Sequence, residues 1–381
     1  MNSKLNNLSV CVAVWGQEFT KTFLNYSLSS VLSENNIPSL SKQTNIFVSI
    51  YTDKNSYKII QKSKYFFILK EHANINFFLI SGVSIIGNYK AMNDCHRHFI
   101  SNNINKSLMI LCPDTIYSDG SLKHLYYLHK NESKIVCVFT PRVDKQNFLL
   151  NYDKKLKTYG KLALNNQELI DLALKHLHPE TLASIVGERN KKSAVNGILF
   201  LKDPDGLIGC NFHYYPIIFK SDKNTKLPRI TIDNDFLDKN EVNYQDIIVV
   251  NKAIECCIID ITDKNRTAFI LNEQRNIDQI VNWAFHNTEN IHRKLFEKVY
   301  HFSKTDKPLS IELKKKIIYL QTEILNGILD VKNQIDLTNS KPFFFRFLNI
   351  LKNNSIFSIL KKIFMRIYIL VFGGLIIKSV K

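Results

Sequence analysis

The chain has 381 residues, of which 45% are hydrophobic and 22% are charged, and its formal net charge is +17. This apolar content excludes an intrinsically disordered protein, and the 12 Gly and 9 Pro without a visible period exclude collagen-like and repeat proteins. The length fits one large α/β domain with appendages, or two domains.

Short apolar runs alternate with helix-like stretches over the first 140 residues. The sequence predicts strands at 9–14, 46–51, 77–80, 107–112 and 134–140, and helices at 19–34 and 88–102. Continuous apolar strands separated by helices are typical of a parallel sheet that is covered on both faces. Such a sheet binds its ligand at the carboxyl ends of the strands, where this sequence places small and polar residues.

The second half of the chain mixes both kinds of element. A helix is predicted over 165–186, a strand over 193–201, and short aromatic strands over 206–236. Two further helices are predicted over 275–302 and 309–331, of which the second has an amphipathic pattern.

The last 45 residues carry nearly half of the positive charge. No acidic residue follows Asp336, whereas eight Lys and Arg do. The uncharged run Ile367–Ile377 is too short for a membrane span, which needs roughly 20 apolar residues. Residues 354–367 have the two-sided pattern of a helix that lies in a membrane surface. We therefore expect a tail over 336–381 that docks on an anionic membrane, with a helix packed on the core as the main alternative.

Cysteine usage indicates a reducing compartment. The seven Cys form no CxxC pair, and three of them lie in predicted apolar strands. The first eight residues are polar and contain no apolar signal region. A cytoplasmic protein that is peripheral to the inner face of the cell membrane is the resulting expectation.

Asp114 is the first candidate for chemistry. It follows the fourth predicted strand, and Asp119 comes five residues later. A carboxylate at this place can hold a hard divalent cation, which in turn holds a diphosphate. The alternative for Asp119 is a turn that caps the next helix.

Several segments resemble nucleotide-sugar-dependent glycosyltransferases of the GT-A type, and in particular bacterial surface-polysaccharide glycosyltransferases. Val14-Trp15-Gly16 closes the first strand, Tyr51-Thr52-Asp53 closes the second, and Asp114 stands where the Asp-x-Asp metal motif of that family falls. The resemblance implies a GT-A-like, Rossmann-type, mostly parallel sheet sandwiched by helices. It also implies that Trp15, Gly16, Thr52 and Asp53 bind the nucleotide. The sequence Asp114-Thr115-Ile116 departs from Asp-x-Asp, so one metal ligand is missing or replaced.

The same resemblance implies three more site residues. His213 matches the distal histidine that completes the metal site of several such enzymes, so Asp114 and His213 would hold Mn²⁺ or Mg²⁺. Asn196 and Gly197 match a segment that lines the sugar site. The alternatives are a histidine packed among aromatic side chains and a plain strand with a bulge.

Three charged residues complete the candidates. Asp233 and Asp235 are two residues apart, which on a strand puts both on one face, and either is a candidate general base for an acceptor hydroxyl. A solvated turn is the alternative. Arg142 follows the fifth predicted strand and is a candidate for binding the donor phosphates.

These observations predict a glycosyltransferase that moves a sugar from a nucleotide-sugar donor to a glycan or lipid-linked acceptor at the cytoplasmic membrane face. The predicted divisions are a catalytic domain over 1–270, a helical extension over 271–335 and the basic apolar tail over 336–381. No Gly-x-Gly-x-x-Gly, Walker A or Gly-x-Ser-x-Gly motif is present. The alternatives are an inactive membrane-associated scaffold and a nucleic-acid-binding basic protein. No nucleic-acid partner is expected, because the sequence contains no recognisable RNA- or DNA-binding motif.

Overall fold

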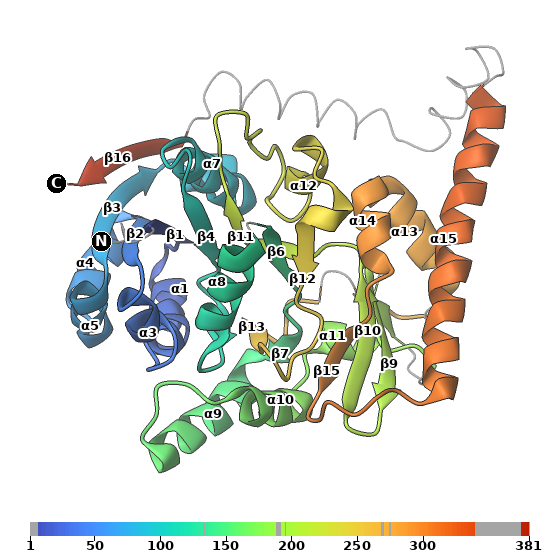
Figure 1. The fold of residues 1–381 in the computed structure, drawn as a ribbon, viewed down its shortest axis with the longest axis horizontal. Coiled ribbons are helices and arrows are strands. Elements are labelled where there is room, and N and C mark those ends of the chain that lie inside the picture. The colour runs from blue at the N-terminus through green and yellow to red at the C-terminus, as the bar shows by residue number, and fades with distance from the viewer. Residues whose placement is uncertain are drawn as a thin grey trace.

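An eight-stranded sheet forms the centre of the protein (Figure 1). The computed structural model describes residues 7–132, 134–187, 192–194, 196–267, 270–273, 276–339 and 375–380. The strand order is β12-β6-β11-β4-β1-β2-β3-β16. In that order the strands are Ile247–Val249, Ile135–Val138, Tyr215–Lys220, Ser107–Leu111, Asn7–Ala13, Asn45–Thr52, Asn74–Ser81 and Ile376–Val380.

The sheet is mostly parallel, as the sequence predicts. Strands β4, β1, β2 and β3 pair in parallel, and so do β12 and β6. Strand β11 runs antiparallel to both β4 and β6, and β16 runs antiparallel to β3. All five strands predicted in the first 140 residues are confirmed.

Both faces of this sheet are buried, which explains why its strands are continuous apolar runs. In β1, Cys11 and Ala13 point into one hydrophobic cluster, while Val10 and Val12 point into another. The first cluster is covered by α7 (Asn88–Ser101) through Phe99. The second is covered by the helical segment that continues from α1 (Gln17–Thr22), chiefly the π-helix η1 (Phe23–Leu28), and by α8 (Ser121–Glu132).

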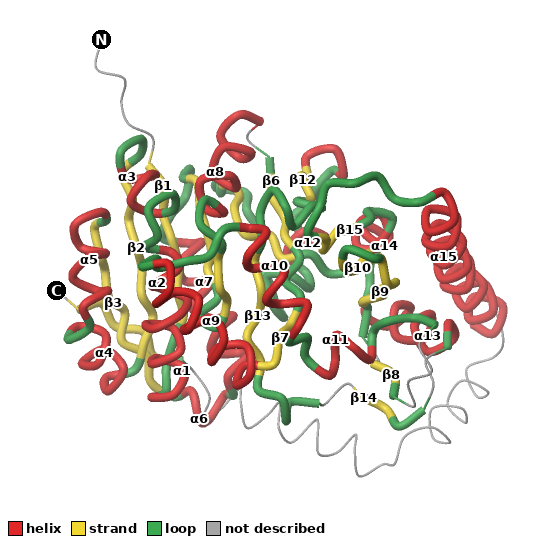
Figure 2. Tube along the Cα trace, turned by 90° about the horizontal axis from the view of Figure 1, so that it is seen from below, coloured by secondary structure: helices red, strands yellow, loops and turns green. Residues whose placement is uncertain are grey.

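Other helices surround this core (Figure 2). They are α2 (Ser29–Val31), α3 (Ile37–Ser41), α4 (Lys54–Gln61), α5 (Lys64–His72), α6 (Val83–Ile86), α9 (Lys145–Tyr159) and α12 (Phe236–Lys239). The helix predicted over 165–186 is two helices, α10 (Asn166–Lys175) and α11 (Pro179–Ala183). The break has a local cause, because Pro179 disfavours helical backbone in the residue before it and occupies the first turn of α11.

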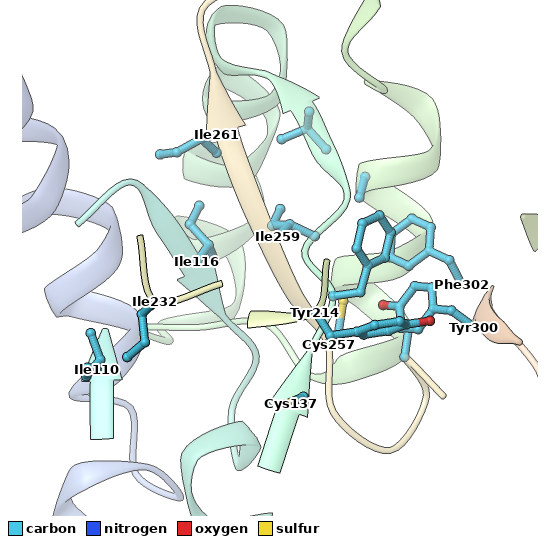
Figure 3. Close-up of a cluster of buried hydrophobic side chains, with 14 of the residues drawn as sticks. Ile110, Ile116, Cys137, Tyr214, Ile232, Cys257, Ile259, Ile261, Tyr300 and Phe302 are labelled. Atoms are coloured by element: carbon cyan, nitrogen blue, oxygen red, sulfur yellow. The ribbon is translucent and has the colours of Figure 1, made fainter. Parts of the chain in front are cut away.

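Two small sheets adjoin the central one. Strand β13 (Ile258–Thr262) pairs antiparallel with β5 (Thr115–Tyr117) and parallel with β7 (Arg142–Asp144). In the other, β10 (Gly206–Asn211) pairs with β9 (Ile198–Asp203) and β15 (Tyr300–Ser303). Buried side chains from both sheets pack in one cluster with Ile110 of β4, as Figure 3 shows.

The predicted strand over 193–201 is interrupted at the Asn196-Gly197 pair. Strand β8 (Ser193–Ala194) precedes the pair and pairs with β14 (Ile270–Leu271), and β9 follows it. The Gly197 backbone has no room for a side chain, because a Cβ there would lie 2.4 Å from Cζ3 of Trp283.

The helix predicted over 275–302 is two helices, and the prediction is wrong at its C-terminal end. It is α13 (Ile277–Asn287), then α14 (Asn290–Phe296), then strand β15. Tyr300 and Phe302 are buried while His301 between them is half-buried, which is a strand periodicity that the sequence analysis missed. The last predicted helix is α15 (Ile311–Asn339).

The tail predicted for membrane attachment is described only in part. Residues 340–374, including the amphipathic pattern at 354–367, lie outside the described residues. Ile376–Val380 do not belong to an apolar tail, because they pair with β3 at the edge of the central sheet. Within the described part of the chain, no helix is long and apolar enough to cross a membrane.

Candidate active site

A cavity of about 420 Å³ opens at the carboxyl ends of β4 and β6. Its walls come from α7, from the β5-β13-β7 sheet, and from α11 and α13. Among the predicted site residues, those that line it are Arg142, Asn196, Gly197, His213 and Asp233. A concave space of this size, with aromatic and a few charged side chains, is typical of a ligand site.

The strand β13 brings two carboxylates and an arginine together. In register, Asp260 stands opposite Thr115 of β5 and opposite Arg142 of β7. Asp114 precedes Thr115, and its carbonyl oxygen accepts a 2.9 Å hydrogen bond from the backbone amide of Ile261. Arg142 pairs with Asp260, and both act electrostatically on the Asp114 carboxyl, so the three side chains lie near one another at the carboxyl ends of β4 and β6.

The environment of Asp114 disfavours its ionised form. Burial and the nearby Asp260 carboxylate raise its pKa to about 7, although Arg266 and Arg142 act in the opposite direction. A carboxylate whose pKa is raised by burial and by a second carboxylate is unusual outside sites that bind a cation or move a proton.

Arg142 is held between carboxylates. Its Nε lies 3.3 Å from Oδ2 of Asp260, and its Nη1 donates to the buried carboxylate of Glu180. Burial alone would lower the pKa of Arg142, but Asp260 and Glu180 raise it above its usual value. Arg142 is thus a fixed positive charge at the cavity wall, with part of its hydrogen-bonding capacity already used.

His213 lines the cavity, but its ring nitrogens face carbonyl oxygens. Nδ1 lies 3.1 Å from the carbonyl oxygen of Asp233, and Nε2 lies 3.0 Å from that of Asn287. The ring also stacks on His292 at 4.5 Å between centroids. Both ring nitrogens therefore face protein carbonyl groups, and neither points to an open position for a metal ion. The geometry gives the predicted metal role of His213 no support.

The described residues contain no group of three or more His, Cys, Asp or Glu side chains that is able to hold a metal ion. Asp114 and Asp260 form a pair of carboxylates only. Mg²⁺-type ions are often held by one or two carboxylates together with phosphate oxygens of the substrate and water. The repulsion that raises the pKa of Asp114 would be relieved by such a cation, so this pair fits a divalent ion that arrives with a phosphate ligand.

The predicted nucleotide-binding residues lie beside the cavity, not in its wall. The Gly16 amide donates a 2.8 Å hydrogen bond to Oδ2 of Asp53, which also caps α4. Burial would raise the pKa of Asp53, but hydrogen bonds from Gly16, Ser56 and Asn55 lower it below its usual range. Thr52 is fully buried. The structure therefore brings Gly16 and Asp53 together, with the Asp53 oxygens already engaged in backbone contacts.

Trp15 connects this group to the cavity. Its Nε1 donates a 3.1 Å hydrogen bond to Oδ1 of Asn88, the first residue of α7. The next residue, Tyr89, lines the cavity although 71% of its surface is exposed. The nucleotide contacts predicted for Trp15, Gly16, Thr52 and Asp53 stay a prediction.

Asp233 and Asp235 do not share a strand face. They lie in a turn before α12 and not on a strand. As a result, the two carboxylates have different surroundings. Asp235 accepts hydrogen bonds from the amides of Arg229 and Ile230 and pairs with Lys239 at 3.6 Å. Asp233 lines the cavity, and within the described part of the chain its carboxylate makes no hydrogen bond or ion pair.

Sequence reasoning missed several residues of the cavity wall. They are Tyr89, Glu180, Asp260 and Trp283. A signal existed for Asp260, since a carboxylate within the apolar run Ile258–Thr262 has to be paired or functional. The sequence did not indicate a site role for Trp283, because a single tryptophan on an amphipathic helix usually packs in the hydrophobic core.

Among known proteins, only solved structures are similar to this chain. No family model matches the chain, and no curated protein matches it. A crystal structure of S. aureus TarS matches with a TM-score of 0.34 and 10% identity over 84% of this chain and 43% of that chain. The chain thus spans less than half the length of that protein.

Two further solved structures illustrate the range of the matches. TarS 1–349 in complex with UDP-GlcNAc has a TM-score of 0.31 and 9% identity over 84% of this chain and 81% of that chain. Mouse xyloside xylosyltransferase 1, apo form, has a TM-score of 0.24 and 9% identity over 40% of this chain and 59% of that chain. Similarity at this level assigns no activity to the chain.

Proposed function

We propose that the protein is a glycosyltransferase that uses a nucleotide-sugar donor. The observation that carries the proposal is the cluster of Asp114, Asp260 and Arg142 beside a 420 Å³ cavity at the carboxyl ends of β4 and β6. Carboxylates and a fixed guanidinium at this edge of a parallel sheet suit a ligand that carries a diphosphate.

The charge of the cavity bears on how such a donor binds. Glu180, Asp233 and Asp260 line it, Asp114 adjoins it, and Arg142 is the only Lys or Arg among its described lining residues. An anionic donor would be repelled unless a divalent cation came with it. Asp114 and Asp260 would hold that cation, which would supply charge neutralisation for the departing nucleoside diphosphate.

Asp233 is the residue we assign as general base. Its carboxylate has no partner within the described residues, so it is free to accept the proton of an acceptor hydroxyl. The hydroxyl oxygen forms a bond to the anomeric carbon of the donor sugar as the bond from that carbon to the diphosphate oxygen breaks. Its proton passes to Asp233, and the electron pair of the broken bond leaves with the nucleotide.

The basic tail bears on where the reaction would take place. We propose that residues 340–374, which carry six of the eight Lys and Arg after Asp336, bind an anionic cytoplasmic membrane face, where a glycan or lipid-linked acceptor would be presented. Sedimentation with vesicles of phosphatidylcholine, with and without phosphatidylglycerol, tests this. Binding that does not depend on the anionic lipid would contradict it.

The activity is tested with the purified full chain, Mn²⁺ and a panel of UDP-, GDP- and CMP-sugars. We expect hydrolysis or transfer with one donor class, loss of turnover in Asp114→Asn, and wild-type turnover in Asp263→Asn, an exposed carboxylate that serves as the matched control. Nucleotide-sugar binding without turnover would favour an inactive scaffold. Binding of nucleic acid with steep salt dependence, and of no nucleotide-sugar, would refute the proposal.

A further inference from the structure

Trp283, from the C-terminal part of the chain, forms part of the cavity wall. It lies on α13 and is half-buried, so part of its indole ring remains accessible at the cavity. Trp15 and Trp283 are the only tryptophans of the protein. Tyr89 of α7 and Trp283 of α13 both line the cavity, and Figures 1 and 2 show these two helices on opposite sides of β7 and β13.

The indole ring is held in place from three directions. A Cβ at Gly197 would lie 2.4 Å from Cζ3 and 2.7 Å from Cη2 of Trp283, so the indole rests directly on that backbone. Phe212 packs at 6.3 Å between ring centroids, and the His213 ring stands edge-on at 5.7 Å. An aromatic ring that is fixed in this way loses little conformational entropy when a ligand stacks on it.

Polar groups of the cavity wall are connected to the Trp283 ring through His213. Asp233 also lines the cavity, and its carbonyl oxygen contacts the His213 ring, which in turn contacts the carbonyl oxygen of Asn287 at the end of α13. An aromatic ring and a carboxylate that line the same cavity suit a ligand that has C–H groups on one side and hydroxyl donors at its rim. A pyranose ring has this character.

The charge near Trp283 selects against anionic ligands. Asp233 is acidic, while Arg142, the only Lys or Arg among the described lining residues, is already bonded to Asp260 and Glu180. A neutral sugar donates hydrogen bonds to a carboxylate, whereas a phosphorylated polyol would meet like charge there without a cation to offset it.

We propose that Trp283 is the platform on which a neutral pyranose ring of the acceptor stacks, with Asp233 facing the acceptor hydroxyl. The assignment of the ring to the acceptor rests on the proposed function, because it places the donor beside Asp114 and Asp260. The platform itself requires only that a neutral sugar bind at this wall of the cavity.

Single-tryptophan variants of the full chain test the platform without turnover. Trp15→Phe leaves Trp283 as the only indole, and Trp283→Phe leaves only Trp15. Each is titrated with methyl β-glucopyranoside, methyl β-galactopyranoside, methyl α-mannopyranoside and glycerol 1-phosphate. We expect at least one neutral pyranoside to change the Trp283 emission saturably, glycerol phosphate to leave it unchanged, and the Trp15 emission to respond to none of them.

A kinetic arm tests the acceptor role. Trp283→Ala should raise the acceptor KM about tenfold and leave the donor KM within about twofold, and Trp283→Phe should restore most of the acceptor affinity. Asn282→Ala, an exposed neighbour on α13, should match the wild type.

The outcomes separate the two proposals. If no pyranoside alters the Trp283 emission, if glycerol phosphate alone alters it, or if Trp283→Ala keeps the wild-type acceptor KM, the platform is wrong. If pyranosides bind at Trp283 while no nucleotide-sugar binds to the protein, the platform stands and the glycosyltransferase proposal fails.

Discussion

The guanidinium of Arg142 bridges Asp260, at 3.3 Å from Nε to Oδ2, and the buried Glu180. Only 4% of the Glu180 side chain is exposed, against 41% for Arg142. The bridge joins β7, β13 and α11 at the wall of the cavity, so it couples the integrity of the fold to the charge of the site.

Arg142→Met should destabilise the protein by about 2–3 kcal/mol, because it leaves the Glu180 carboxylate buried without its partner. The double variant Arg142→Met/Glu180→Gln should recover most of that loss, since no buried charge remains unpaired. Urea unfolding measures both, with the exposed Lys264→Met as control. Additive effects of the two changes would show that the pair does not interact.

Asp114→Asn should stabilise the metal-free protein while it abolishes activity. The folded pKa of Asp114 is about 7, above its ordinary value of 3.8, so the folded state keeps a proton that the unfolded chain has lost. Stability is therefore lost as pH rises through this window, and the amide removes the loss. We expect a higher Tm than wild type at pH 8, little difference near pH 4, and turnover reduced by at least about 100-fold. Thermal melts in a chelator would contradict this if the difference were independent of pH.

Gly197→Ala should destabilise the protein by about 1–3 kcal/mol and shift the Trp283 emission, because the new methyl group overlaps the indole ring. In the Trp283→Leu background the same change should cost less, since the smaller side chain gives way. A double-mutant cycle of unfolding free energies measures this coupling. A cycle that closes additively would mean that Trp283 does not rest on Gly197 in solution.

His96 should make the protein sensitive to mild acid. It is buried on α7, and burial lowers its pKa from 6.5 to about 4, although Asp233 acts in the opposite direction. Between these values the unfolded chain binds a proton that the folded chain does not, so stability falls as pH falls from 6.5 to 4, by up to about 3 kcal/mol. His96→Gln should flatten the dependence of Tm on pH in this window, whereas the exposed His286→Gln should not. An unchanged slope in His96→Gln would count against a buried neutral imidazole.

Removal of residues 376–381 should expose the edge of β3. Strand β16 pairs with β3 from Ser81 to Phe77, and an unpaired edge strand invites association with other chains. We expect a lower Tm and greater light scattering with rising protein concentration than for the full chain. Ser379→Ala keeps the pairing and serves as control. A truncated protein that scatters like the full chain would show that β16 does not protect this edge.

The sequence was informative where local pattern and fold agree. The strands β1, β2 and β4 could be predicted because both faces are buried, so most residues of each run are apolar. Asp114, Arg142 and Gly197 could be located because they follow or interrupt such runs.

The rest of the site depends on contacts that no local pattern encodes. Arg142 meets Glu180 across 38 residues and Asp260 across 118 residues of sequence. Asp235 looked equivalent to Asp233, yet a turn gives the two carboxylates different partners. Such pairings follow from how the chain is folded in three dimensions, which one sequence without relatives does not disclose.

The return of the chain to β3 has a geometric consequence. Figure 1 places α15 and β16 on opposite flanks of the protein, so the two elements that flank residues 340–374 in sequence lie far apart. A surface that binds this basic segment is therefore joined to the protein through two elements, α15 and β16. Such a double attachment would restrict the orientation of the cavity relative to that surface more than a single attachment does.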